Sequence, residues 1–132
     1  HREENTTQMA EELIEVLKVY EKACNAADAA LVASLYTADG MILPEAMPTA
    51  IGKDVAGFYA GAFEALQLTL KFDFDPNNFF IQGNLAYGNT KSTGTRLIRA
   101  TNDTVPENNR ELWIFKKVGT WKIHRYMFNK YE

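Results

Sequence analysis

The chain has 132 residues, of which 46% are hydrophobic and 23% charged, which is typical of one globular domain with its own core. Its formal net charge of −3 argues against a general nucleic-acid-binding role, since that role needs a basic surface. No apolar run is long enough to span a bilayer, and a single cysteine, Cys24, excludes an intrachain disulfide. The start at His1 leaves the compartment open between the cytoplasm and export after signal cleavage.

The first half of the chain carries helical periodicity. Residues 1–8 are polar and are predicted to form a flexible tail. An amphipathic helix is predicted over about residues 7–26, because apolar side chains recur there at helical spacing. Asp28 predicts an N-cap for a shorter helix over Ala29–Tyr36.

A short strand and a third helix complete this half. Met41–Leu43 indicates a buried strand that Pro44 stops, and residues 44–52 contain two prolines and no period, which is typical of a loop. The next helix is predicted from Lys53 or Asp54 to Leu66, with an apolar stripe that contains Phe58, Tyr59 and Phe63.

After residue 67 the period changes from helical to two, which predicts strands. These cover residues 68–74, 79–82, 85–98, 110–118 and 120 to about 130, with turns at 75–78, 83–84 and 119 and a loop at 100–109. Three helices followed by antiparallel strands predict an α+β fold. Leu112 and Ile114 give one face of a strand an apolar character, and Trp113 and Phe115 do the same for the other. Because helices cover one face only, we expect a homodimer through the sheet.

Several local phrases carry a family resemblance: Tyr20 with Asp28 eight residues later, LYTADGMIL (35–43), IGKDVAGFY (51–59) and FKKVGTWKIHRYMFN (115–129). From about residue 9 onward the chain resembles the ketosteroid isomerase and nuclear transport factor superfamily, in its polyketide-cyclase-like branch. The resemblance implies a cone in which a strongly curved, mixed or antiparallel sheet wraps three helices around a pocket. It does not define a function, because this fold hosts isomerases, dehydratases, hydrolases, cyclases and inert association modules.

The resemblance also implies which side chains line the pocket. These are Tyr20, Tyr59, Tyr87, Asn89, Lys91, Glu111, Trp113, His124, Tyr126 and Phe128. On the last strand, regular alternation then turns Lys122 inward together with His124, Tyr126 and Phe128. It turns the other face toward a partner subunit or solvent: Trp121, Ile123, Arg125 and Met127.

Catalytic roles follow from the same resemblance. Tyr20 matches a tyrosine that donates a hydrogen bond to a developing oxyanion, Tyr59 matches its supporting tyrosine, and Glu111 stands where the isomerases carry a protonated Asp. Their general base is replaced here by Pro44, with Glu45 beside it, so ketosteroid isomerase activity is not expected. His124 is the alternative base, because imidazole titrates near neutral pH.

Structural roles compete with each of these assignments. Lys91 either pairs with Glu111, which would keep that carboxyl ionised, or binds an anionic ligand. Tyr20 can equally be a core aromatic residue, and a lone histidine such as His124 is more often hydrogen-bonded structure than a base. Glu45 is expected in a solvated loop. No metal-ligand spacing and no phosphate-binding loop occur in the sequence, so we expect neither metal nor cofactor.

Residues 1–132 are therefore predicted to form one cone-shaped domain with a pocket for a small, partly apolar molecule. The compatible chemistry is cofactor-free acid–base catalysis of an isomerase, cyclase or dehydratase kind by His124, Glu111 and Tyr20. The alternative is a non-catalytic dimerisation module. A pocket filled by Tyr87, Trp113 and Phe128 would favour the module, whereas an open pocket of roughly a few hundred Å³ would favour a ligand site.

Overall fold

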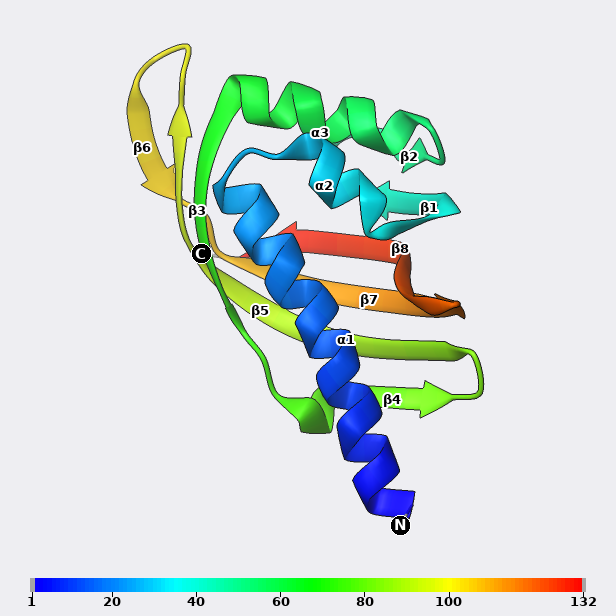
Figure 1. Ribbon diagram of the computed structural model, residues 1–132. Helices are drawn as coiled ribbons and strands as arrows, with labels where there is room; N and C mark the ends of the chain where they lie inside the picture. The colour runs from blue at the N-terminus through cyan, green and yellow to red at the C-terminus, as the bar shows by residue number, and fades with distance from the viewer. Residues whose placement is uncertain (1, 132) are drawn as a thin grey trace.

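The computed structural model describes residues 2–131, with side chains described from residue 7 onward. Three helices, α1 (Arg2–Asn25), α2 (Ala29–Ser34) and α3 (Asp54–Ala65), lie on the concave side of a curved sheet (Figure 1). The predicted α+β cone fold is confirmed. None of the described helices is both long and apolar enough to cross a membrane.

The sheet has eight strands and is mixed. They are β1 (Tyr36–Leu43), β2 (Ala50–Ile51), β3 (Leu66–Asp73), β4 (Phe79–Gln82), β5 (Leu85–Ile98), β6 (Asp103–Pro106), β7 (Asn109–Val118) and β8 (Thr120–Lys130). Their order is β2-β1-β8-β7-β5-β3, with β4 and β6 also paired to β5. The β1–β8 pair is parallel and every other described pair is antiparallel. Two short strands, β2 and β6, lie in segments that were expected to be loops.

Helix α1 is positioned by its apolar stripe, as the periodicity predicts. Leu13 and Leu17 are fully buried, and Tyr20 and Cys24 lie on the same face against the sheet. The helix starts at Arg2, so residues 2–8, expected as a tail, belong to it, and their sequence contains neither Gly nor Pro to break a helix. His1 lies outside the described residues.

The start of α2 is fixed by the predicted N-cap. The Asp28 carboxylate accepts a hydrogen bond from the Leu31 backbone N–H at 3.0 Å. This contact satisfies one of the donors that a helix start leaves free. The helix ends at Ser34, and β1 begins at Tyr36, five residues before the strand that was expected at Met41.

Strand β5 carries the curvature of the sheet, and glycine permits two close approaches along it. A Cβ atom at Gly88 would lie 2.3 Å from the Phe79 ring, and one at Gly94 would lie 1.8 Å from the Thr69 carbonyl oxygen. Gly94 therefore lets β3 pack directly against β5 where the strand bends (Figure 1).

The inward face of β8 differs from the predicted one because the strand contains a β-bulge. Ile114 pairs with Arg125 but Phe115 pairs with Ile123, so His124 is an extra residue without its own partner on β7. The bulge reverses the alternation: Trp121 and Ile123 are buried in the core, as is Tyr126 beyond the bulge. The prediction that Trp121 and Ile123 face a partner or solvent was wrong.

The inward face of β5 is also shifted by one residue from the prediction. Thr90 and Ser92 are buried on the concave side, whereas Tyr87, Asn89 and Lys91 are exposed on the convex side. Thr90 lies beside Glu111 in the β5–β7 register, and residues paired across a sheet point to the same face.

Candidate functional site

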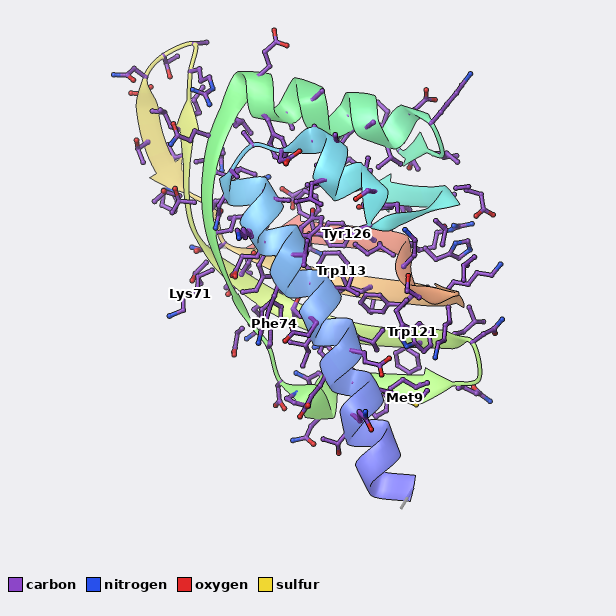
Figure 2. The ribbon with its side chains drawn as sticks, viewed as in Figure 1. Met9, Lys71, Phe74, Trp113, Trp121 and Tyr126 are labelled. Atoms are coloured by element: carbon purple, nitrogen blue, oxygen red, sulfur yellow. The ribbon has the colours of Figure 1, made fainter. Side chains whose placement is uncertain are left out.

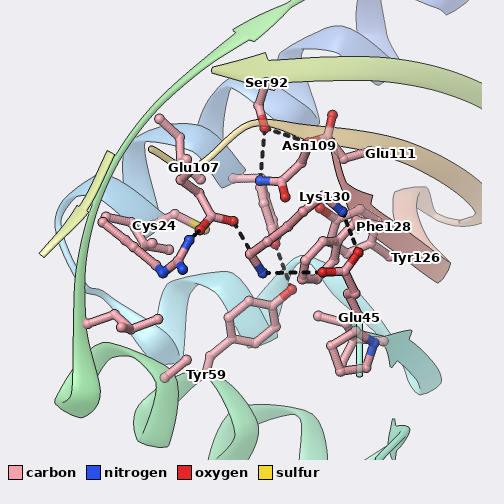
Figure 3. Close-up of a pocket in the computed structure, with 18 of the residues that line it drawn as sticks. Cys24, Glu45, Tyr59, Ser92, Glu107, Asn109, Glu111, Tyr126, Phe128 and Lys130 are labelled. Carbon is pink, nitrogen blue, oxygen red and sulfur yellow. Dashed lines mark hydrogen bonds and ion pairs between the residues drawn. The ribbon is translucent and has the colours of Figure 1, made fainter. Parts of the chain in front are cut away.

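A cavity of about 200 Å³ lies between α1, α3 and the concave face of the sheet. Its walls are mostly apolar and include Phe58 and Phe63 of α3, Leu68 and Leu70 of β3, and Phe128 of β8. Its polar side chains include tyrosines and three carboxyl groups; Figure 3 labels Tyr59 and the carboxyl groups of Glu45, Glu107 and Glu111. A mostly apolar cavity with a few convergent polar groups is the usual form of a small-molecule site.

The tyrosine cluster joins α1, α3 and β1. The Tyr59 hydroxyl lies 2.7 Å from the Tyr20 hydroxyl and 2.6 Å from the Tyr36 hydroxyl, so three hydroxyl groups form one hydrogen-bonded chain. Burial raises the pKa of all three phenols, and of Tyr126 beside them. These hydroxyls therefore stay protonated and neutral at physiological pH.

Glu111 is the buried carboxyl group of the site. Its two oxygens accept hydrogen bonds from the Thr90 hydroxyl at 2.7 Å and the Ser92 hydroxyl at 2.5 Å. Burial raises its pKa from 4.5 to about 7, and nearby Glu107 acts in the same direction, while the two hydroxyl donors act against the rise. Glu111 can therefore gain or lose a proton near neutral pH.

Both hydroxyl groups are oriented toward Glu111 by a donor behind them. The Trp113 indole N–H donates to Thr90 Oγ1 at 2.9 Å, and the Asn109 side-chain amide contacts Ser92 Oγ at 3.4 Å. Each hydroxyl accepts from behind and thus directs its own hydrogen to the carboxyl group. This arrangement solvates the ionised form of Glu111.

Asn109 also brings an unsatisfied acceptor to the cavity. The residue is 4% exposed and lines the cavity, and among the described residues its Oδ1 has no hydrogen-bond partner. A buried acceptor without a partner costs roughly 1–3 kcal/mol. A group that could donate to this oxygen would recover that free energy.

Four charged residues meet at one side of the cavity. Arg96 binds Glu107 at 2.7 Å, and Lys130 Nζ lies 3.7 Å from Glu107 Oε2 and 4.0 Å from Glu45 Oε2. Glu45 also accepts the Lys130 backbone N–H at 2.7 Å. Figure 3 shows Lys130 between the two carboxylates. Glu45 thus lines the cavity, although it was expected to be solvated.

Half of the predicted site residues line this cavity: Tyr20, Tyr59, Glu111, Tyr126 and Phe128. Trp113 is fully buried beneath it, stacked on Tyr126 with ring centroids 3.7 Å apart (Figure 2). Tyr87, Asn89 and Lys91 point away from it. The Lys91–Glu111 pair, one of the two alternatives for Lys91, is not among the ion pairs of the described residues, because Lys91 is exposed on the opposite face of the sheet. Lys91 lies instead over the Tyr131 ring, 5.9 Å from its centroid.

His124 lies at the β8 bulge, outside the cavity lining. Its Nδ1 is 2.8 Å from Thr37 Oγ1 and 3.8 Å from Asp39 Oδ1. Burial lowers its pKa, Arg125 lowers it further, and Asp39 opposes the shift. The expected convergence of His124 with Glu111 and Tyr20 is therefore wrong, because the bulge turns the imidazole away.

Sequence reasoning missed Ser92, Asn109, Glu107, Arg96 and Lys130, all of which line the cavity. A signal existed for Asn109, since it precedes Glu111 by two residues and Trp113 by four on one strand. Ser92 would have followed from the correct face of β5. Glu107 lies in a predicted loop, and periodicity carries no information there. Among the described residues, no cluster of His, Cys, Asp or Glu is arranged to hold a metal ion.

Comparison with known proteins identifies the fold. No family model matches the sequence, and no curated protein matches it. A ketosteroid isomerase-like protein from Erwinia carotovora atroseptica is 26% identical, with a TM-score of 0.79 over 89% of this chain and 92% of that one. The chain has the ketosteroid isomerase-like fold.

Two further solved structures share this fold. A nuclear transport factor 2-like superfamily protein from Salmonella enterica serovar Typhimurium has a TM-score of 0.85 at 20% identity, covering 96% of this chain and 94% of that one. A hexachlorocyclohexane dehydrochlorinase has a TM-score of 0.79 at 12% identity, covering 95% and 88%. At these identities the ketosteroid isomerase-like fold is what is shared.

Proposed function

We propose that this protein binds a small, partly apolar molecule in the cavity and acts on it by cofactor-free acid–base chemistry, as a member of the polyketide-cyclase-like branch. The observation that carries the proposal is one apolar cavity of about 200 Å³ that contains both Glu111 and the Tyr20–Tyr59 hydroxyl pair. A carboxyl group with a pKa of about 7 is suited to proton transfer near neutral pH.

In this proposal Glu111 is the general base. Thr90 and Ser92 both donate hydrogen bonds to its oxygens, and two such bonds stabilise the ionised form of the carboxyl group. This differs from the role that the family resemblance implies, in which a protonated carboxyl group donates to an oxyanion. Pro44, which the resemblance matches to the isomerases' base, lines the cavity but cannot take a proton, so in this proposal Glu111 is the base instead.

Tyr20 is the proposed hydrogen-bond donor to the ligand. Three hydroxyl groups in a chain hold three hydrogens but make two bonds with one another. When Tyr36 donates to Tyr59 and Tyr59 to Tyr20, the Tyr20 hydrogen is not used within this chain. Its other neighbours are Cys24 and Tyr126, and in this proposal it turns from them to negative charge on a bound molecule. The dehydrochlorinase is in keeping with acid–base chemistry on this fold.

The second candidate is a non-catalytic dimerisation module, favoured by the apolar convex face of the sheet. Leu112, Ile114 and Met127 are exposed there. A closed pocket filled by side chains would have favoured this candidate. Tyr87, one of the expected fillers, points outward, and Trp113 lies beneath the cavity rather than in it. Dimerisation and ligand binding are compatible on opposite faces.

The test of binding is a screen of small apolar molecules by ligand-observed NMR against two matched variants of α3. Ala62 lines the cavity and Ala60 is exposed on the same helix. We expect Ala62→Phe to fill part of the cavity and abolish the hits, and Ala60→Phe to retain them. Hits that survive Ala62→Phe, or an absence of hits for the wild-type protein, would refute the proposed ligand site.

A further inference from the structure

The inner polar end of the cavity presents acceptors to a ligand and few donors. Asn109 Oδ1 has no partner among the described residues, and Glu111 is an acceptor of hydroxyl hydrogens. The Ser92 hydroxyl contacts both residues, at 3.4 Å to the Asn109 amide nitrogen and 2.5 Å to Glu111. Ser92 therefore joins the two residues, and all three line the same cavity.

The number of hydrogens on that group matters. A ligand hydroxyl carries one hydrogen and can satisfy one acceptor, whereas an ammonium or amine carries several and can bond both. Because Asn109 Oδ1 is buried, a ligand that leaves it without a donor forgoes a hydrogen bond that water would have provided. Glu111 keeps its bonds from Thr90 and Ser92 and would gain a charge-assisted bond from an ammonium.

The charges around the cavity favour a cation over an anion. Its lining contains three carboxyl groups, Glu45, Glu107 and Glu111, and two cations, Arg96 and Lys130. Both cations are engaged by Glu45 and Glu107. An ionised Glu111 therefore has no cationic partner in the lining, and a bound ammonium would provide one.

The remaining walls limit the rest of the ligand. Phe72, Tyr126 and Phe128 line the cavity with aromatic surface. Aromatic faces attract a nearby cation and accept apolar groups. A dry protein cavity of about 150 Å³ accommodates benzene, so a cavity of about 200 Å³ suits a molecule of about one ring.

We propose that the ligand of this pocket is a small amine, about one ring in size, whose N–H groups bond Asn109 Oδ1 and Glu111. This inference rests on the proposed function, since it specifies the ligand class of the same cavity. The amine inference is compatible with Glu111 as a general base. The ionised carboxylate first accepts a hydrogen bond from the ligand's ammonium group, and it takes a proton from the ligand only after that.

The test is isothermal titration of the wild-type protein at mildly alkaline pH with four probes of one shape: benzylamine, benzyl alcohol, benzoate and toluene. Benzylamine stays protonated under these conditions. We expect it to bind roughly ten-fold or more tightly than benzyl alcohol, as charge-assisted hydrogen bonds are stronger than neutral ones. Benzoate should bind most weakly, because its charge would face an ionised Glu111.

Variants of the cavity then test whether Glu111 and Asn109 produce the preference for benzylamine. Glu111→Gln and Asn109→Leu should each reduce the ratio of benzylamine to benzyl alcohol affinity by about ten-fold or more, judged against charge-assisted bond strengths. Glu64→Gln removes an exposed carboxyl group of α3 and should leave the ratio unchanged. The wild-type comparison stands even if a cavity variant does not fold.

The outcomes separate the two proposals. Benzyl alcohol or benzoate binding as tightly as benzylamine overturns the amine inference while the ligand pocket stands. An amine preference that persists in both cavity variants also overturns it, because recognition would then lie elsewhere. Failure of all four probes to bind counts against the proposed pocket itself, and the inference falls with it.

Discussion

Glu111 makes folding stability depend on pH. The folded protein keeps this proton up to about pH 7, while an unfolded chain releases it near 4.5. The free energy of unfolding therefore falls as pH rises between these values, and the loss is complete above the folded pKa. A rise of this size corresponds to roughly 3 kcal/mol. We predict that Glu111→Gln removes this loss.

Urea unfolding at several pH values between about 4 and 8 measures the effect as the difference between variant and wild type. As the pH rises, the free energy of unfolding of Glu111→Gln should increase relative to that of the wild-type protein. Burial lowers the pKa of His124, but this residue is present in both proteins and its contribution cancels in the difference. A difference that does not change with pH would contradict the prediction, because it would mean that Glu111 has the same pKa in the folded and unfolded states.

The Tyr59 hydroxyl is predicted to stabilise the cluster, because it bonds both Tyr20 and Tyr36. Removing it in Tyr59→Phe leaves two buried hydroxyl groups short of a partner, and we expect a loss of roughly 1–3 kcal/mol in the free energy of unfolding. Tyr87→Phe makes the same chemical change at an exposed side chain and should have almost no effect. Equal losses from the two variants would show that the hydroxyl chain contributes nothing.

At the scale of the element, the β8 bulge decides which side chains of this strand are buried in the core. Trp121 is 5% exposed on the concave face, whereas Lys122 carries one exposed hydrogen bond, to the Ser34 carbonyl. Trp121→Ala should lower the free energy of unfolding by roughly 3–5 kcal/mol through the cavity it leaves. Lys122→Ala should cost about 1 kcal/mol or less. Thermal or urea unfolding would contradict this assignment if Lys122→Ala lost more stability than Trp121→Ala, since that result would support regular alternation along β8.

The positions of the helices and strands were largely predictable from the sequence. Which face of each strand points toward the core was less predictable. Strong periodicity located the three helices and the long strands, and the Asp28 cap is where its residue type predicts. Alternation assumes an unbroken strand, and nothing in Ile123-His124-Arg125 marks His124 as the extra residue, because the bulge follows from pairing with β7. The one-residue shift of β5 arose similarly, since only the register with Glu111 fixes Thr90 and Ser92 inward.

The family resemblance predicted the site only in part, since Tyr87, Asn89 and Lys91 came from it as well and point away from the cavity. Tyr20, Tyr59 and Glu111 were found because each matches a position in the resemblance. Arg96 and Glu107 could not be predicted from the sequence, because their ion pair depends on the bend of β5 and on a segment without periodicity.

At the scale of the whole molecule, the convex face of the sheet is predicted to form a homodimer interface. Leu112, Ile114 and Met127 are exposed there beside one another, since Leu112 pairs with Met127 across β7 and β8. A contiguous exposed apolar patch of this kind marks an interaction site. We predict that the wild-type protein sediments as a dimer in analytical ultracentrifugation and that Leu112→Glu shifts it to the monomer.

The matched control is Ala56→Glu, which introduces the same charge at an exposed position of α3. It should leave the dimer intact. A wild-type monomer at micromolar concentration would contradict the prediction, as would a Leu112→Glu dimer of unchanged affinity.

The most direct test of the whole account is a crystal structure of the protein with the tightest-binding small molecule from the screen. The account predicts that the molecule lies between α1, α3 and the sheet, within hydrogen-bond distance of Asn109 Oδ1 or Glu111, with Tyr20 at its other side. A molecule bound on the convex face, or a cavity closed by side chains that exclude it, would contradict the central claim.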